Sequence, residues 1–296
     1  MKIGSDTPLW LAARALLAMR QKEFFRRWQQ VQEGFEAETV HDLRIASRRL
    51  REGVALFAPC YPAKSLSRIT RRVKGVTRLL GDMRNTDEAL LYFTSLAERI
   101  DGQTASALAT HIDRLGKERD REAVRLRGAL ESLSIKVLRF YFEKTLGNPC
   151  LFSLPPGSAD PFGTIGSFAR QTLDERLSLV LGLVPKSCDE ADIPAQHTLR
   201  IAIKHFRYRL EILSFLIDRG SQEIIADLKR YQDLLGWMHD RDVFADQVRG
   251  AAFTPLAERS VLESIARERH ELYAEFLVLL EDKPLEGIGK RVRSAL

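Results

Sequence analysis

The chain has 296 residues, of which 45% are hydrophobic and 29% are charged. Its 18 glycines and 11 prolines are too few for a collagen-like or low-complexity protein. No apolar run approaches the ~18 residues of a membrane span, and Arg14 comes too early for the apolar core of a signal peptide. The three cysteines lie far apart, which argues against a disulfide framework or thiolate zinc site and favours a cytoplasmic location.

Positive charge is concentrated in one segment. The chain carries 46 Lys and Arg against 40 Asp and Glu, a formal net charge of +6. Residues 41–84 hold eleven basic and three acidic residues, so this segment is +8 and the remainder is −2. Basicity concentrated in this way indicates a polyanionic partner.

Apolar residues recur every three or four positions along most of the chain, which predicts an all-α fold. In the first half, helices are expected over residues 8–34, 40–58, 63–80 and 86–146, the last of them broken. In the second half, helices are expected over residues 162–183, 194–218, 221–236 and 240–281. Short connections between long amphipathic helices favour up-and-down bundles.

Several residues predict where helices begin and end. Thr39 with Asp42 fits a capping box at the start of the second helix. Pro194 suits the first turn of a helix in the second half. Gly81 and Gly236 are expected at a helix C-terminus or in a tight turn.

The main interruption is rich in proline and glycine and covers residues 148–161. Such a composition predicts a linker. It separates two halves, residues 1–147 and 162–296, each of which is expected to form one four-helix bundle.

The two halves share two sequence patterns. The pattern H-x-L-R-I-A-x-[RK]-[RH]-[LF]-R begins at His41 and again at His197. The pattern L-L-G-x-M-x-x-x-D follows at Leu79 and again at Leu234. Two signatures in the same order at nearly the same spacing predict an internal duplication.

The first pattern, wound into a helix, places cations on one face and apolar residues on the opposite face. In the first half these cationic-face residues are His41, Arg44, Arg48 and Arg51, with Arg49 at the edge. In the second half they are His197, Arg200, Lys204 and Arg207, with His205 at the edge and Tyr208 also on this face. Two bundles related by a pseudo-twofold axis would turn both faces toward one shared groove.

The next helix of the first half carries a second cationic stripe, formed by Lys64, Arg68, Arg71, Lys74 and Arg78. No acid lies between its ends, so its like charges repel one another unless an anion neutralises them. The counterpart in the second half is poorer, since only Lys229 and Arg230 are clearly basic and Asp233 replaces Arg78. Arginine offers a planar fork and lysine a point charge to phosphate oxygens, so these stripes suit a linear polyanion with closely spaced phosphates.

These patterns resemble the CHAD family, named for its conserved histidine α-helical domain. The resemblance covers about residues 8–285. It implies two four-helix bundles about a pseudo-twofold axis with a basic central groove or pore, binding of inorganic polyphosphate, and association with polyphosphate granules; free phosphate or sulfate would mimic the ligand. Carried over by position, the implied binding residues are His41, Arg44, Arg48, Arg49, Arg51, Arg71, Lys74, Arg78, His197, Arg200, Lys204, His205, Arg207 and Lys229.

The sequence also departs from the family pattern. Lys204 and His205 replace arginines often found in the motif, and Asp233 brings a negative charge close to the expected groove. Many CHAD domains are fused to a triphosphate-tunnel domain with an E-x-E-x-K strand. No such motif is found, because Glu36-Ala-Glu38-Thr-Val40 ends without the lysine.

Three other functions stay open at this point. A basic groove would also bind nucleic acid, although nucleic-acid modules usually add stacking aromatics. The His41-Asp42 and His239-Asp240 pairs are similar to those of HD metal phosphohydrolases, and the scattered histidines allow metal chelation. The favoured interpretation is a non-catalytic polyphosphate-binding protein without cofactor or metal, of unspecified oligomeric state.

Overall fold

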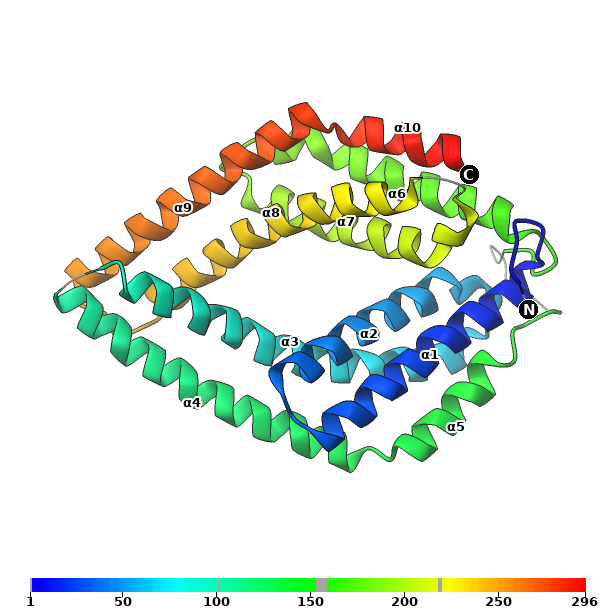
Figure 1. Cartoon of the computed structure of the whole chain (residues 1–296), viewed down its shortest axis with the longest axis horizontal. Coiled ribbons are helices and arrows are strands. Elements are labelled where there is room, and N and C mark those ends of the chain that lie inside the picture. The colour runs from blue at the N-terminus through cyan, green and yellow to red at the C-terminus, as the bar shows by residue number, and fades with distance from the viewer. Residues whose placement is uncertain (1, 101, 153–158, 218–219) are drawn as a thin grey trace. The chain divides into compact units, whose positions relative to one another are not determined.

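The computed structural model describes residues 2–100, 102–152, 159–217 and 220–296, which form helices and no β-strand (Figure 1). The α-helices are α1 (Leu9–Glu33), α2 (Ala37–Leu56), α3 (Ala63–Ala97), α4 (Gln103–Ser132), α5 (Ile135–Leu146), α6 (Ile165–Ser187), α7 (Ile193–Leu213), α8 (Ser221–Arg249), α9 (Pro255–Asp282) and α10 (Leu285–Ala295). Two short 3-10 helices, η1 (Ala58–Cys60) and η2 (Ser214–Leu216), follow α2 and α7. The predicted all-α fold is confirmed.

The chain divides into two compact units. The first unit comprises residues 1–86 and 118–172, and the second comprises residues 87–117 and 173–296. Residues 87–117 therefore group with the second half of the chain, although they precede the predicted linker. The repeat boundaries at 148–161 and the duplication itself stay predictions, and residues 153–158 of that linker lie outside the described residues.

In the first unit, α1 packs against both α2 and α5. Its buried aromatic residues account for the contact with α5, since the rings of Phe25 and Phe142 meet edge to face with centroids 5.4 Å apart. Phe24 and Trp28 are also buried on this face of α1. Aromatic side chains bury large apolar areas, so this cluster holds the short helix α5 in place.

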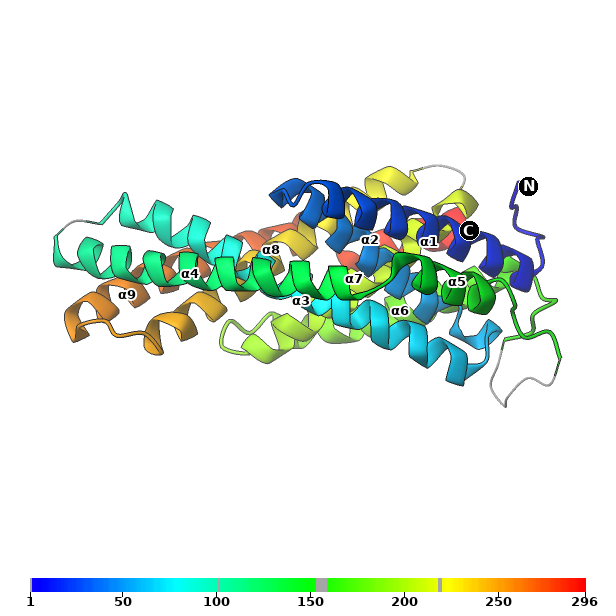
Figure 2. The same ribbon diagram turned by 90° about the horizontal axis from the view of Figure 1, so that it is seen from below.

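In the second unit, α8 runs alongside both α7 and α9 (Figures 1 and 2). One end of this unit has a core built from two distant parts of the sequence. Tyr92 and Phe93 of α3 pack with Phe244 of α8 and Val261 of α9. The Tyr92 and Phe244 rings stack with centroids 4.7 Å apart. This apolar packing explains why residues 87–117 belong to the second unit.

The prediction that Gly81 and Gly236 end helices is wrong. Helix α3 continues from Ala63 to Ala97 through Gly81, and α8 continues from Ser221 to Arg249 through Gly236. A glycine inside a helix costs only about 1 kcal/mol relative to alanine. The buried neighbours Leu80 and Leu235 supply more than that through apolar burial.

Of the predicted helix starts, one is confirmed and one is wrong. Pro194 lies in the first turn of α7, where the Asp192 side chain caps the helix by accepting a 2.9 Å hydrogen bond from the Ala195 N–H. Thr39 does not cap α2, because the helix already begins at Ala37. The Thr39 hydroxyl instead lies within hydrogen-bonding distance of preceding carbonyl oxygens, at 2.8 Å from that of Glu36.

Candidate functional site

Helix α2 presents a buried apolar face and a partly accessible cationic face, as its sequence predicts. Leu43 and Leu50 are fully buried. The cationic residues, which we call the α2 row, are His41, Arg44, Arg48 and Arg51, and all are half-buried. Arg49 is also half-buried, at the edge of this face.

Helix α3 meets α2 at a pair of hydroxyl groups. The oxygens of Thr77 and Ser47 lie 3.2 Å apart. Arg44 and Arg51 lie about one turn before and after Ser47 on α2, and Lys74 lies one turn before Thr77 on α3. Cations of both helices therefore flank one junction within the first unit.

The cationic stripe of α3, which we call the α3 row, is exposed to solvent. Its members are Lys64, Arg68, Arg71, Lys74 and Arg78. Within the described part of the chain, no carboxylate forms an ion pair with any of them. The opposite stripe of the same helix, including Leu66, Ile69 and Val73, is buried. The amphipathic pattern predicted for this helix is thus confirmed, and its cations are available to a ligand.

His41 occupies the fifth position of α2 and lies close to Arg84 of α3. Its pKa is lowered mainly by burial, and then by the positive charges of Arg84 and Arg44. Asp42 opposes this shift, but its carboxylate also lies 2.5 Å from the Arg27 guanidinium of α1. His41 is therefore largely neutral at neutral pH in the ligand-free protein.

In the second unit, α7 and α8 meet in an antiparallel register. His197, also the fifth residue of its helix, lies opposite His239, with their Nδ1 atoms 3.2 Å apart. The Arg200 side chain passes over Gly236, where a Cβ atom would lie 3.7 Å from Nε. The Arg207 Nε donates a 3.1 Å hydrogen bond to Gln232. When the two sequence patterns are superimposed, the Ser47–Thr77 contact of the first unit falls in the same register as these contacts of the second unit.

The cationic residues of α7, which we call the α7 row, are His197, Arg200, Lys204 and Arg207. The first three are half-buried, as is His205 at the edge. Arg207 is only 8% exposed, and its guanidinium forms an ion pair with Glu211 on the next turn. Arg207 is therefore already partnered within its own helix.

Tyr208, predicted on the cationic face of α7, lies beside Arg207 of that face, whose guanidinium is 4.7 Å from the centre of its ring. Tyr208 is nevertheless buried. A tyrosine held in this way offers no free ring face for a nucleobase to stack on. The only aromatic residue predicted on the motif faces is thus removed from the accessible surface.

Lys229 is paired with a carboxylate of its own helix. Its ammonium group donates a 2.7 Å hydrogen bond to Asp233, the residue that replaces Arg78. Both residues line a cavity between α8 and α9, together with the half-exposed Trp237. The second unit therefore lacks a counterpart of the exposed, unpaired α3 row at this position.

Burial and neighbouring cations keep the histidine pair of the second unit neutral. The pKa of His239 is lowered to about 4 by burial and by the charges of Arg200, His197 and Lys204. The pKa of His197 is also lowered, mainly by burial and by Arg200. A hydrogen bond between two Nδ1 atoms needs one protonated and one unprotonated nitrogen, which two neutral imidazoles supply.

The sequence-predicted set of binding residues omits Arg84 and His239, which the structure places beside the motif histidines. They occupy the same place in the two copies of the second pattern, L-L-G-x-M-R and L-L-G-x-M-H. Superimposing the two copies would have identified this position. It is a cation in the first unit and a titratable group in the second.

Two other properties bear on the alternative functions. The described residues contain no group of three or more His, Cys, Asp and Glu side chains that could hold a metal ion. Within the same residues, no helix is long and apolar enough to cross a membrane.

Comparisons with known proteins give one family and two similar structures. The sequence model of the CHAD domain matches residues 15–249. The crystal structure of the CHAD domain from the plant Ricinus communis has a TM-score of 0.66 and 23% identity, and covers 100% of this chain and 95% of that one. PptA from Streptomyces chartreusis has a TM-score of 0.66 and 16% identity, and covers 93% of this chain and 99% of that one. No curated protein matches the chain.

Proposed function

Because this chain belongs to the CHAD domain family, we propose that it binds inorganic polyphosphate without catalysing a reaction. The observation that carries this proposal is the α3 row, five exposed cations along one helix face with no carboxylate paired to them among the described residues. Unpaired like charges at this spacing repel one another, and a polyanion would relieve that repulsion.

The spacing of the row suits a linear chain of phosphates. Successive cations are three or four residues apart, which advances about 4.5–6 Å along the helix axis. Each arginine can bind two phosphate oxygens with its planar fork. The ligand would therefore lie along α3 and engage several phosphates at once.

The α2 row would complete the site from the other side of the Ser47–Thr77 junction. Arg51 supports this assignment, because burial and the nearby Arg48 lower the pKa of its guanidinium. A partly desolvated cation gains more from an anion than a fully hydrated one does. We include His41, Arg44, Arg48, Arg49 and Arg51 in the proposed site, with Arg84 added.

The second unit would contribute less. His197, Arg200, Lys204 and His205 are half-buried on α7, whereas Arg207 and Lys229 already have carboxylate partners. A cytoplasmic location on polyphosphate granules also belongs to this proposal.

A charge-reversal experiment tests the site. The variant Arg71→Glu/Lys74→Glu/Arg78→Glu removes three contacts of about 1 kcal/mol each, so its affinity for long-chain polyphosphate should fall by about 100-fold. The matched control Lys136→Glu/Arg267→Glu/Lys290→Glu changes three exposed cations and the net charge equally. It should bind almost as the wild type does. Equal losses in both variants, with helical circular dichroism retained, would refute the assigned site.

Competition distinguishes polyphosphate from nucleic acid. Excess polyphosphate should displace a labelled single-stranded RNA from the protein, whereas the RNA should displace polyphosphate poorly at the same salt concentration. The buried state of Tyr208 favours this outcome, since base stacking is a major source of affinity for single strands. Tighter binding of RNA than of polyphosphate would overturn the proposal.

A further inference from the structure

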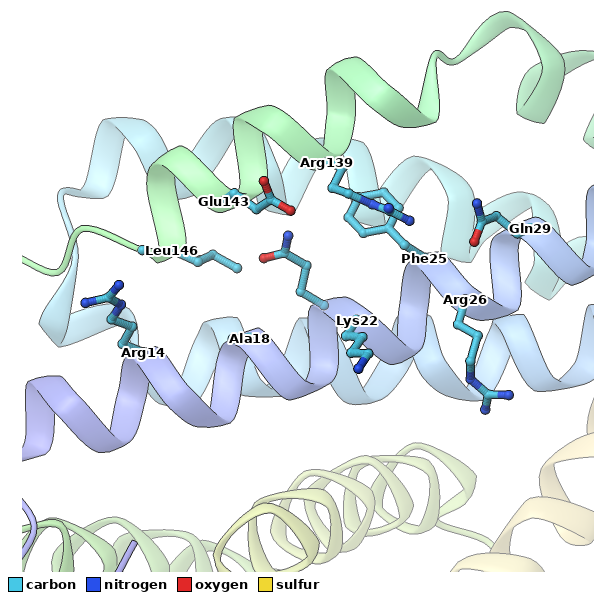
Figure 3. Close-up of a pocket in the computed structure, with 11 residues that line it drawn as sticks. Arg14, Ala18, Lys22, Phe25, Arg26, Gln29, Arg139, Glu143 and Leu146 are labelled. Atoms are coloured by element: carbon cyan, nitrogen blue, oxygen red, sulfur yellow. The ribbon is translucent and has the colours of Figure 1, made fainter. Parts of the chain in front are cut away.

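A cavity of about 600 Å³ lies between α1 and α5 in the first unit (Figure 3). This volume is within the range of small-molecule binding pockets. Residues of both helices line it: Arg14, Ala18, Gln21, Lys22, Phe25, Arg26 and Gln29 from α1, and Arg139, Glu143, Leu146 and the adjoining Gly147 from α5. None of these residues belongs to the cationic rows.

Gln21 is the buried polar group of this cavity. Gln21 is only 7% exposed, and its side chain forms no hydrogen bond to any other described residue. Its amide therefore faces the cavity, where a hydrogen-bonding ligand can reach it. An amide in this position can both donate to and accept from a ligand.

Arg139 supplies a flat cationic surface. Its guanidinium lies over the Phe25 ring, 5.4 Å from the ring centre (Figure 3). Nucleobases stack on arginine guanidinium planes as well as on aromatic rings. The Phe25 ring would hold the guanidinium flat, so the opposite guanidinium face could receive a planar ligand.

Glu143 supplies the acceptor. Its exposed carboxylate lies one turn beyond Arg139 on α5 and points toward α1 across the cavity (Figure 3). No cation of the described chain lies within ion-pair distance of it. A carboxylate accepts hydrogen bonds from exocyclic amino groups, and a glutamine amide can pair with a base edge in a bidentate manner.

An unpaired cation, Arg14, lies two turns before Gln21 on α1. Arg14 lies seven residues before Gln21, which is about 10 Å along the helix. Arg14 and Lys22 form no ion pair with a described residue, whereas Arg26 is bonded to Glu23 at 2.7 Å. The cavity thus combines a base-sized polar region with one cation, Arg14, at a distance that the sugar and phosphates of a nucleotide can span.

We propose that this cavity binds a nucleoside phosphate whose base carries an exocyclic amino group. The base stacks on Arg139, its polar edge faces Gln21 and Glu143, and its phosphates reach Arg14. Glu143 would repel a bare phosphate chain, which makes this site distinct from the proposed polyphosphate site. The inference does not depend on polyphosphate binding.

Calorimetric titration with ATP, GTP, CTP and UTP tests this proposal. The first three bases have an amino group, whereas uracil presents only an imide N–H between two carbonyl oxygens. ATP, GTP or CTP should bind about tenfold more tightly than UTP, because a charged acceptor makes a strong hydrogen bond to the amino group. Equal affinity for all four nucleotides, or no binding of any, would overturn the proposal.

Variants locate the site. Glu143→Gln keeps the size of the side chain and should reduce the preference for amino-bearing bases over UTP. Arg139→Ala should weaken the binding of all four nucleotides. The triple variant of the α3 row should keep nucleotide binding even where it loses polyphosphate. Loss of nucleotide binding in the α3-row variant would place the ligand elsewhere and contradict the inference. Displacement of the nucleotide by an equal concentration of tripolyphosphate would contradict it as well. Thermal unfolding of each variant verifies that the fold is retained.

Discussion

The helix pair α2/α3 in the first unit and the pair α7/α8 in the second share an antiparallel register but differ in how their cations are used. Lys74 and Arg78 are exposed and unpaired among the described residues, whereas their counterparts are Lys229 and Asp233, bonded to each other at 2.7 Å. The same backbone arrangement thus supports an open cationic face in one unit and a partly neutralised face in the other. Shared sequence motifs do not imply equal shares of binding.

Exchanging one charge between the two units gives the largest expected effect. Arg78→Asp gives α3 the acid found on α8 and should weaken polyphosphate binding by about tenfold, since it removes one contact and adds repulsion. Asp233→Arg releases Lys229 and should strengthen binding by a similar factor if α8 reaches the ligand. Titration of both variants with polyphosphate of one defined length measures the difference. Unchanged affinity in the Arg78→Asp variant would remove α3 from the site.

The second comparison concerns Arg84 and His239, which occupy equivalent places. In the free protein, burial and nearby cations lower the pKa values of His41 and His197, so both are mainly neutral at pH 7. A bound phosphate favours the protonated imidazole. Binding should therefore take up protons, and affinity should rise by about tenfold between pH 8 and pH 6.

Exchange of these two residues sharpens that prediction. His239→Arg places a fixed charge beside His197 and so opposes protonation of that histidine, which should strengthen binding at pH 8 and flatten the pH profile. Arg84→His should do the reverse. The measurement is the polyphosphate affinity of each variant at pH 6, 7 and 8. If affinity still rises steeply as pH falls in the His239→Arg variant, the second unit does not supply the charge that is linked to proton uptake.

Acid should destabilise the second unit, because burial lowers the pKa values of both His111 and His239 to about 4 in the folded protein. Between pH 4 and the ordinary histidine value of 6.5, the unfolded chain binds more protons than the folded chain. The free energy of unfolding should therefore rise with pH through this window and level off above it. Urea unfolding at pH 5 and pH 7.5 should differ by about 1 kcal/mol after solvent screening. His239→Gln should reduce that difference, and an unchanged difference would assign it to other groups.

The smallest expected effects come from the two mid-helix glycines. A Cβ at Gly81 would meet no atom within 4 Å, and one at Gly236 would make an ordinary 3.7 Å contact with Arg200 Nε. Gly81→Ala and Gly236→Ala should each raise the free energy of unfolding by about 0.5–1 kcal/mol, because alanine favours helix. Destabilisation by Gly81→Ala would indicate a turn at that position, contrary to the continuous α3 helix.

The faces of the motif helices could be predicted from the sequence, because burial follows the 3.6-residue period. Leu43 and Leu199 are fully buried, while Arg44 and Arg200 remain partly accessible. The ion pairs that engage Arg207 and Lys229 were also within reach of the sequence. Their partners Glu211 and Asp233 lie four residues on, where helical neighbours meet.

Other features depend on packing that no local pattern encodes. The continuation of α3 through Gly81 depends on the burial of residues beyond it, including Met83. The cavity beside Gln21 exists because α5, more than a hundred residues farther along the chain, packs against α1.

The dependence of polyphosphate affinity on salt concentration tests the central claim most directly, because its logarithmic slope reports how many phosphate contacts the protein makes. By analogy with nucleic acids, the slope should become shallower by about 3 in Arg71→Glu/Lys74→Glu/Arg78→Glu relative to the wild type. It should stay at the wild-type value in Lys136→Glu/Arg267→Glu/Lys290→Glu. Equal slopes in all three proteins would show that the exposed cations of α3 do not contact the ligand, and would contradict the account.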